Sequence, residues 1–206
     1  MLDLGELVAT YDMKINGVLH VGAHLAEEAS TYHDLGAGNV TWVEANPAVM
    51  PQINEVLAHY PGQRVIQALV YSEDGAWLDF NVTNFDGMSS SILEFGDHRV
   101  LYPDTVFVDK VKLHTSTIDS IADVYGVAAN FLLMDIQGAE LHALKGATRF
   151  LQSVDYVMSE VNDAEVYVDC AKVWELDAVL AGFERVATHW VGDQHWGDGL
   201  WVRRQG

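Results

Sequence analysis

The chain has 206 residues, 50% of them hydrophobic, and a formal net charge of −19 from 30 acidic residues against 11 lysines and arginines. This length and apolar content predict one domain over residues 1–206 with a sizeable core. The acidic balance argues against nucleic acid or an anionic membrane as a partner. No apolar run approaches the ~20 residues that cross a bilayer, and the N-terminus lacks the basic start of a signal peptide, so we expect a cytoplasmic protein.

The first third of the chain alternates short apolar runs with amphipathic segments. This pattern predicts, in order, a strand at Val18–Gly22, a helix at Leu25–Leu35, a strand at Val40–Glu44, a helix that begins at Pro47 and stops at Pro61–Gly62, and a strand at Val65–Val70. A β-α-β-α-β order closes most simply as parallel strands joined by right-handed helical crossovers. We therefore predict an α/β fold.

The middle of the chain loses this periodicity. Ala76–Val82 and Phe107–Leu113 have extended patterns, and residues 84–105 between them predict a mobile insert on the substrate side. Beyond it, the pattern predicts a helix from Thr117, a strand at Phe131–Asp135, a helix after Gln137–Glu140, a strand at Val154–Glu160 and a helix at Ala171–Ala181. Two extended runs, Phe183–Val191 and Gly199–Arg203, predict a C-terminal antiparallel hairpin.

The most informative segment joins the first two predicted strands. An apolar strand turns at Gly22 towards a helix, and Glu44 follows 22 residues later at the end of the next strand. A glycine turn followed by such an acid is how an α/β sheet holds the ribose of a nucleoside. We interpret Glu44 as an acceptor for both ribose hydroxyls, in preference to an acid that only caps the loop before Pro47.

Acidic residues also end two later strands. Because ligands bind at the carboxyl ends of parallel strands, we expect Glu44, Asp135 and Glu160 to face one crevice. For Asp135, a role as base or substrate anchor and a structural role in accepting amides of the following turn fit the pattern equally well. Glu140, near a helix start, is better explained as structural because the helix dipole favours a negative charge there.

These residues are also compatible with other functions. A nicotinamide-dependent oxidoreductase would also use a glycine turn and a ribose acid, but it needs two further glycines, where this chain has His24 and Glu27. His20 and His24 are four residues apart, but one lies on a strand and the other past the turn, so we predict no structural zinc. Magnesium between Asp135, Glu160 and substrate oxygens is an alternative, since hard cations prefer carboxylates.

Four motifs together resemble the FkbM-family methyltransferases. They are Val21–His24, Trp42–Pro47, Met134–Leu141 followed by Leu144–Ala147, and Gly197–Trp201. The third is highly specific, whereas a glycine turn alone is a weak signal. The resemblance implies a Rossmann-like sheet of seven, mostly parallel strands with helices on both faces. It also implies S-adenosylmethionine as cofactor and O-methylation of a sugar, glycan or other small molecule.

Carried over residue by residue, the resemblance implies contacts with the cofactor. Gly22 and Ala23 would line its amino acid portion, Glu44 would hold its ribose with Ala45 beside it, and Ala68 and Leu69 would border its adenine. His24 stands where the family pattern has Asn, and it could still donate to the cofactor carboxylate. Asp135 would lie near the methyl group.

Methyl transfer from a sulfonium is an in-line displacement, so the protein mainly has to position a nucleophilic oxygen and exclude water. A hydroxyl nucleophile gains from a nearby base, and we predict Asp135 and Glu160 as the catalytic residues, with His98 and His195 as further candidates on loops. We expect the segment Met88–Ser91 to form a substrate-side lid together with His98 and Tyr102.

The chain departs from the family pattern at three positions, where His20, His24 and Ala26 replace an expected Asp, Asn and Gly. Gly22 remains, so the turn can still form. The loss of an acid at His20 and the added methyl of Ala26 keep a second interpretation open, a non-catalytic module that has the fold without the cofactor affinity.

Overall fold

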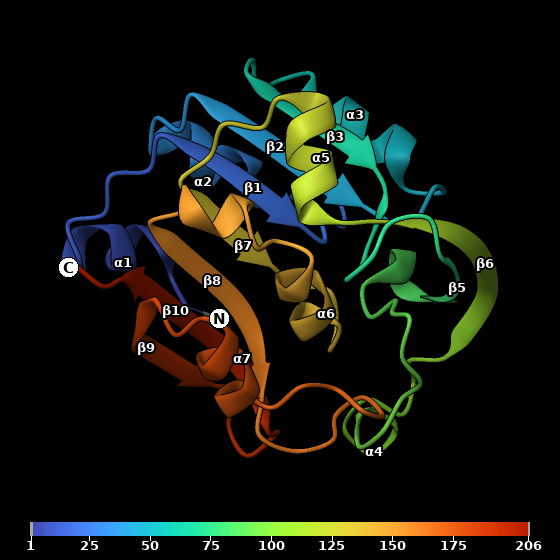
Figure 1. Cartoon of the computed structure of the whole chain (residues 1–206). Helices are drawn as coiled ribbons and strands as arrows, with labels where there is room; N and C mark the ends of the chain where they lie inside the picture. Colours follow the sequence, from blue (N-terminus) through green and yellow to red (C-terminus); the bar gives the residue numbers. More distant parts are fainter. Residues whose placement is uncertain (1, 206) are drawn as a thin grey trace.

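A computed structural model of the chain describes residues 2–205. Its main sheet has seven strands in the order β3-β2-β1-β7-β8-β10-β9 (Figure 1). They are β1 (Gly17–Val21), β2 (Asn39–Glu44), β3 (Gln63–Gln67), β7 (Phe131–Met134), β8 (Tyr156–Asn162), β9 (Phe183–Trp190) and β10 (Trp196–Arg203). Strands β3, β2, β1, β7 and β8 are parallel, whereas β10 is antiparallel to β8 and β9. The carboxyl ends of the parallel strands therefore share one edge.

Helices cover both faces of this sheet (Figure 1). One hydrophobic cluster contains the apolar sides of α1 (Leu4–Thr10), α2 (Ala29–Asp34) and α3 (Met50–Leu57). A second cluster contains those of α5 (Ile118–Tyr125), α6 (Glu140–Lys145), the short 3-10 helix η2 (Phe150–Gln152) and α7 (Val173–Val179). The predicted α/β fold, with its mostly parallel sheet and C-terminal antiparallel hairpin, is confirmed.

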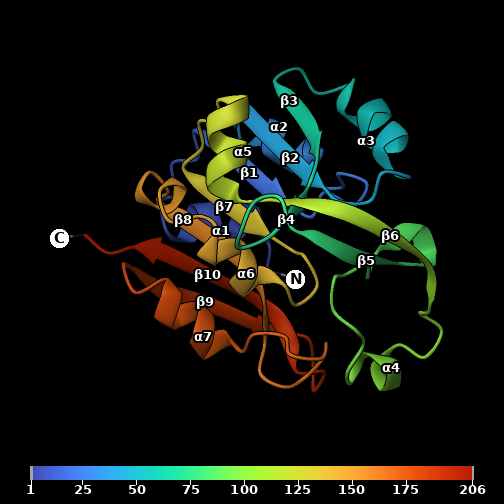
Figure 2. The same ribbon diagram turned by 45° about the vertical axis from the view of Figure 1, so that its right-hand side comes forward.

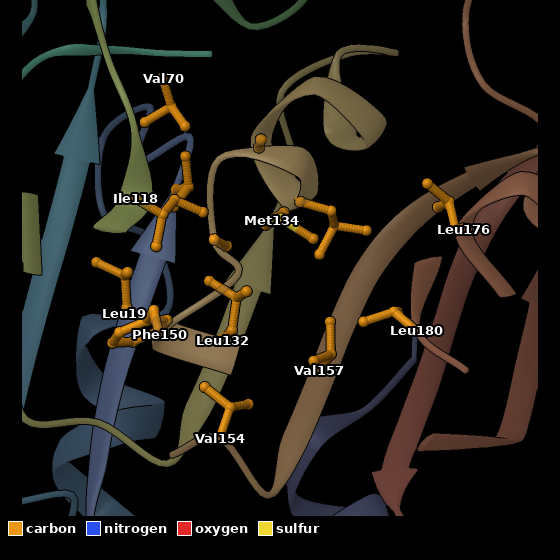
Figure 3. Close-up of a cluster of buried hydrophobic side chains, with 14 of the residues drawn as sticks. Leu19, Val70, Ile118, Leu132, Met134, Phe150, Val154, Val157, Leu176 and Leu180 are labelled. Carbon is orange, nitrogen blue, oxygen red and sulfur yellow. The ribbon is translucent and has the colours of Figure 1, made fainter. Parts of the chain in front are cut away.

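The second cluster forms the core beneath the strands that carry the site (Figure 3). Leu19 of β1, Leu132 of β7 and Val157 of β8 are fully buried in it, together with Ile118 of α5 and Leu176 of α7. These strands are buried on both faces, which explains why the sequence shows continuous apolar runs instead of alternation. Packing on both faces holds the carboxyl ends of the strands in fixed positions.

Two helices in the first half differ from their predicted bounds. The helix predicted at Leu25–Leu35 is only α2, because His24 and Ala26 have φ values of 43° and 58°, which an α-helix cannot contain. The helix predicted from Pro47 is α3, which has Pro51 in its first turn, so Pro47 lies outside it.

A second sheet, of order β4-β6-β5, contains β4 (Leu69–Val70), β5 (Trp77–Thr83) and β6 (Phe107–Ser116). The strand predicted at Val65–Val70 is therefore two strands in two sheets. The chain leaves the main sheet after β3, and β4 pairs with Thr115–Ser116 instead. Figure 2 shows β5 and β6 as an arm that extends from the main sheet towards α4.

Residues 84–105, predicted as a mobile insert, contain the 3-10 helix η1 (Phe85–Gly87) and the helix α4 (His98–Leu101). The insert pairs with β5 through a bridge between Asn81 and Ser91. A bridge between Phe95 and Tyr167 ties it to the segment that follows β8. The insert thus links the arm, through β5, to the segment that follows β8 of the main sheet.

Candidate active site

A cavity of about 300 Å³ lies at the carboxyl ends of β1, β2, β7 and β8. All residues predicted to bind the cofactor, and the two acids predicted to be catalytic, line this cavity: Gly22, Ala23, His24, Glu44, Ala45, Ala68, Leu69, Asp135 and Glu160. The second sheet and the insert contribute Phe80, Met88, Ser90 and Ile92. The volume is in the range of small-molecule sites, which are usually concave and largely apolar.

Gly22 follows directly after β1 and has a positive φ of 94°. The backbone N–H groups of Gly22 and Ala23 both donate to the carbonyl oxygen of Val43, at 2.9 and 3.1 Å. A Cβ on Gly22 would lie 1.8 Å from the carbonyl oxygen of Asp135. Only glycine fits here, since both the positive φ and the close backbone approach exclude a side chain.

Glu44 is a buried acid with 8% of its surface exposed. Its Oε2 accepts a hydrogen bond from the His24 backbone N–H at 2.9 Å, and its Oε1 accepts one from the Asn46 backbone N–H at 2.7 Å. Burial raises the pKa of the carboxyl, and these backbone hydrogen bonds oppose the shift. Each oxygen keeps a further lone pair, so Glu44 both fixes the two turns and offers oriented acceptors to a ligand.

His24 lies beside Glu44 and lines the cavity. Its Nδ1 is 2.6 Å from Glu27 Oε1, and this hydrogen bond raises the pKa of the imidazole. Its Nε2 has no hydrogen-bond partner among residues 2–205. No lysine or arginine appears among the described residues that line the cavity, so His24 is the side chain best placed to carry a positive charge there.

His20 stands where the family resemblance predicts an acid, and it does not supply a charge in place of that acid. The side chain is buried, and burial lowers its pKa to about 3. The Tyr32 hydroxyl lies 3.0 Å from His20 Nδ1, and the Trp42 ring stacks on the imidazole at 4.4 Å. His20 is therefore neutral near pH 7 and packs beneath the glycine turn.

Gln137, to which the sequence analysis gave no role, joins the two predicted catalytic acids. Its Nε2 donates to Asp135 Oδ1 at 2.5 Å and to Glu160 Oε2 at 2.9 Å. Its Oε1 accepts a hydrogen bond from the Tyr167 hydroxyl at 2.5 Å, and its backbone oxygen accepts one from Ser91 Oγ at 2.8 Å. These contacts fix the amide and hold the two carboxyl groups side by side.

Burial raises the pKa of both acids. For Asp135, the hydrogen bond from Gln137 opposes this rise, whereas for Glu160 the charges of Asp135 and Glu140 add to it and take the pKa well above the usual range. The rise in pKa is therefore larger for Glu160 than for Asp135, because nearby negative charges add to the effect of burial at Glu160.

Glu140 lies apart from the cavity lining. Its Oε1 accepts hydrogen bonds from the backbone N–H groups of Ile136 and Gly138, at 3.0 and 3.2 Å. Burial raises its pKa to about 7. The carboxyl group caps the turn that leads into α6, as a structural acid would.

His98 and His195, predicted as further candidate bases, do not line the cavity. His98 is buried and stacks on Phe95 at 4.2 Å, and burial lowers its pKa to about 4. His195 Nδ1 lies 2.7 Å from Asp163 Oδ1 in the connection between β9 and β10. Both rings are held by local contacts instead of facing the crevice.

Only part of the predicted lid segment lines the cavity. Met88 and Ser90 line the cavity, whereas the Tyr102 hydroxyl bonds to Gln194 and to Trp196 Nε1 outside it. Four residues at or beside the site were not predicted from the sequence: Phe80, Gln137, Tyr167 and Asp198. Gln137 and Asp198 lie inside the quoted motifs, so a signal existed for them. No local sequence pattern points to Tyr167. It reaches Gln137 only because the segment after β8 pairs with the insert.

Within residues 2–205, no three His, Cys, Asp or Glu side chains are grouped so that they could hold a metal ion. None of the helices in this part of the chain has the length and hydropathy needed to span a membrane.

Residues 20–185 match the methyltransferase FkbM domain. The chain belongs to the FkbM methyltransferase family. This FkbM methyltransferase is 22% identical over 178 residues to the 2-O-methyltransferase NoeI of Sinorhizobium fredii, a match that covers 82% of this chain and 73% of NoeI. Residues 20–185, which match the family, contain the glycine turn, Glu44 and the Asp135–Glu160 pair.

Solved methyltransferase structures share the fold of this FkbM methyltransferase. A SAM-dependent methyltransferase from Aquifex aeolicus has a TM-score of 0.53 at 13% identity, over 98% of this chain and 90% of its own. Fibrillarin from Aeropyrum pernix, solved with natively bound S-adenosyl-L-methionine, has a TM-score of 0.52 at 15% identity. That match covers 91% of this chain and 66% of fibrillarin. These similarities establish the Rossmann-like methyltransferase fold.

Proposed function

We propose that this FkbM methyltransferase transfers the methyl group of S-adenosylmethionine to a hydroxyl of a sugar, glycan or other small molecule. The observation that carries the proposal is the pair of Asp135 and Glu160, which Gln137 holds together in the cavity of the glycine turn. The name of the relative, a 2-O-methyltransferase, supports oxygen as the acceptor atom. The net charge of −19 favours a small acceptor over nucleic acid or a membrane.

The residues that line the cavity fit the cofactor. Glu44 presents fixed carboxylate oxygens to the two ribose hydroxyls, and the small apolar side chains of Ala45, Ala68 and Leu69 suit the adenine ring. His24 would pair with the carboxylate of the amino acid portion, since its pKa is raised and its Nε2 lacks a partner among the described residues. The ribose, the adenine and the carboxylate of the cofactor would thus meet groups of complementary chemistry.

S-adenosylmethionine supplies an electrophilic methyl carbon on a sulfonium sulfur. Asp135 would accept the proton of the acceptor hydroxyl as that oxygen takes the methyl group. The proton would end on Asp135, the acceptor would become a methyl ether, and the cofactor would leave as a neutral thioether. Gln137, which also bonds to Glu160, holds the Asp135 carboxylate in place, and Phe80 and Met88 exclude water.

Calorimetric titration with S-adenosylmethionine, S-adenosylhomocysteine and NAD tests the cofactor. We expect the first two to bind and NAD to fail, with Glu44→Gln weakening both by at least about tenfold, because it replaces a charged hydrogen-bond acceptor. Glu55→Gln, an exposed acid on α3, is the matched control. Binding of NAD instead would identify an oxidoreductase, and binding of none of the three would identify a non-catalytic module.

Transfer of radiolabelled methyl groups to a panel of sugars and hydroxylated small molecules tests the chemistry. Once an acceptor is found, Asp135→Asn should lower kcat by at least about 100-fold, in the range of general base catalysis. Full turnover by both Asp135→Asn and Glu160→Gln would contradict the assigned roles.

A further inference from the structure

A second cavity, of about 340 Å³, lies next to the first, between the β5–β6 arm and α6. Its lining includes Tyr71, Asp79, Asn81, Lys110 and His142. Ile92 lines both cavities, so a single side chain forms part of the wall between them. We call this second cavity the arm groove. It plays no part in the proposed binding of the cofactor.

One side of the arm groove is aromatic. The rings of Tyr71 and His142 stack at 4.5 Å with an angle of 20° between their planes. Burial lowers the pKa of His142, so the ring is neutral near pH 7. A flat, uncharged pair of rings suits the apolar face of another ring.

Asn81 supplies a buried polar group to the lining. The side chain is 2% exposed, and its Nδ2 donates to the Leu93 carbonyl oxygen at 3.2 Å. Its Oδ1 has no hydrogen-bond partner among residues 2–205. An unmet buried acceptor costs free energy and calls for an explanation, and a donor from a ligand would supply one.

The charged groups around the arm groove are already balanced. Lys110 Nζ lies 3.8 Å from Glu94 Oε1, and Lys112 Nζ lies 3.9 Å from Asp79 Oδ1. Both pairs keep free donors and acceptors, since each ammonium has three N–H groups and each carboxylate has several lone pairs. Each charged group of the lining thus lies within 4 Å of an opposite charge, so the groove offers many hydrogen bonds with little uncompensated charge, which favours a ligand with hydroxyl groups over an ion.

We propose that the arm groove binds a second, hydroxyl-rich ring of the acceptor, so that the acceptor is an uncharged molecule of at least two sugar-sized units. One unit lies beside Asp135 in the first cavity, and the chain of the acceptor passes Ile92 to place the next unit against Tyr71 and Asn81. This inference rests on the proposed function, because it extends the acceptor of that reaction.

The test uses protein labelled with ¹³C at the isoleucine methyl groups and saturated with S-adenosylhomocysteine. Ile136 lines only the first cavity, so its signal reports the cofactor product, whereas Ile92 reports both cavities. Glucose, cellobiose and cellotriose, which have one, two and three uncharged rings, are then titrated separately. We expect cellobiose to shift Ile92 and to bind at least tenfold more tightly than glucose.

Substitutions in the arm groove test whether it causes the tighter binding of cellobiose. Asn81→Leu and, separately, Tyr71→Leu should each lower the affinity for cellobiose until it is within twofold of the affinity for glucose. Asn54→Leu is the matched control, because Asn54 also donates from Nδ2 to a carbonyl oxygen but lies on α3. Unchanged affinity for S-adenosylhomocysteine in all variants shows that they fold.

The outcomes separate this inference from the proposed function. Equal affinity for glucose and cellobiose, an Ile92 signal that no sugar shifts, or full cellobiose binding by both groove variants would overturn the arm groove as an acceptor site. Failure of S-adenosylhomocysteine to shift Ile136 in the wild-type protein would overturn the proposed function as well, because the cofactor site would then be absent.

Discussion

The α-carbon of Gly22 faces the carbonyl oxygen of Asp135 so closely that a Cβ on Gly22 would lie 1.8 Å from that oxygen. The backbone N–H of Asp135 also donates to the Val21 carbonyl oxygen at 2.9 Å. The residue that opens the glycine turn and the proposed base are thus direct backbone neighbours. Their spacing is set by the sheet, which fixes the cofactor turn relative to the acid pair.

Gly22→Ala should destabilise the fold by about 3 kcal/mol or more, because the methyl group collides with backbone and the residue has positive φ. We also expect affinity for S-adenosylhomocysteine to fall by at least about tenfold, or about 1.4 kcal/mol. Urea denaturation and calorimetry measure the two effects. Gly36→Ala is the control, with φ of 73° and no atom within 4 Å of its Cβ, and it should cost only about 1 kcal/mol. Equal losses in the two variants would contradict the close contact.

Ala26 adopts φ of 58° where the family pattern expects glycine. In Ala26→Gly, relief of about 1–2 kcal/mol of backbone strain is offset by loss of a buried methyl group and by a freer unfolded chain. We expect a net change in unfolding free energy below about 1 kcal/mol. Ala26→Val should cost at least about 2 kcal/mol, because a branched side chain at positive φ must also enter a packed site. Chemical denaturation of both variants checks this, and a well-tolerated valine would show that the turn adapts.

His20 should make the stability depend on pH. Its pKa is about 3 in the folded chain against 6.5 normally, so between these values the unfolded chain binds a proton that the folded chain does not. The stabilisation is therefore complete above pH 6.5 and is lost as the pH falls towards 3. Relative to His20→Phe, the wild-type protein should lose about 2–3 kcal/mol between pH 6.5 and 4.5.

Urea denaturation of both proteins across this range measures the difference. The buried acids with raised pKa are common to both proteins, so their opposite contribution cancels. Parallel stability curves would mean that His20 titrates with an ordinary pKa.

Tyr167→Phe removes the hydrogen bond that fixes the Gln137 amide. Because the bond from Gln137 lowers the pKa of Asp135, a freed amide should let that pKa rise further. We expect a loss of about 1–3 kcal/mol in stability from the unmet amide oxygen, with affinity for S-adenosylhomocysteine unchanged within about twofold. Carboxyl ¹³C NMR titration measures the pKa. Tyr102→Phe is the control, because its hydroxyl bonds outside the cavity, and an identical Asp135 titration in wild type and Tyr167→Phe would refute the positioning role.

Much of the fold could be predicted from the sequence, because the signals are local. Strands buried on both faces need continuous apolar runs, as at β1 and β7, and a helix that begins at Thr117 needs its capping hydroxyl. Errors occurred where backbone conformation overrides the pattern. The helix after the glycine turn is short because His24 and Ala26 are left-handed, a feature that apolar periodicity does not encode.

The sequence by itself determined the sheet, the glycine turn and the acids at the strand ends, because each follows from residue types a few positions apart. Only the tertiary structure decided that Gln137 joins Asp135 to Glu160, that Tyr167 fixes this amide, and that His98 is buried away from the cavity. It also decided that the arm, the insert and α6 together line a second cavity. These relationships join residues far apart in the chain, and they exist only once the strands and the insert have paired.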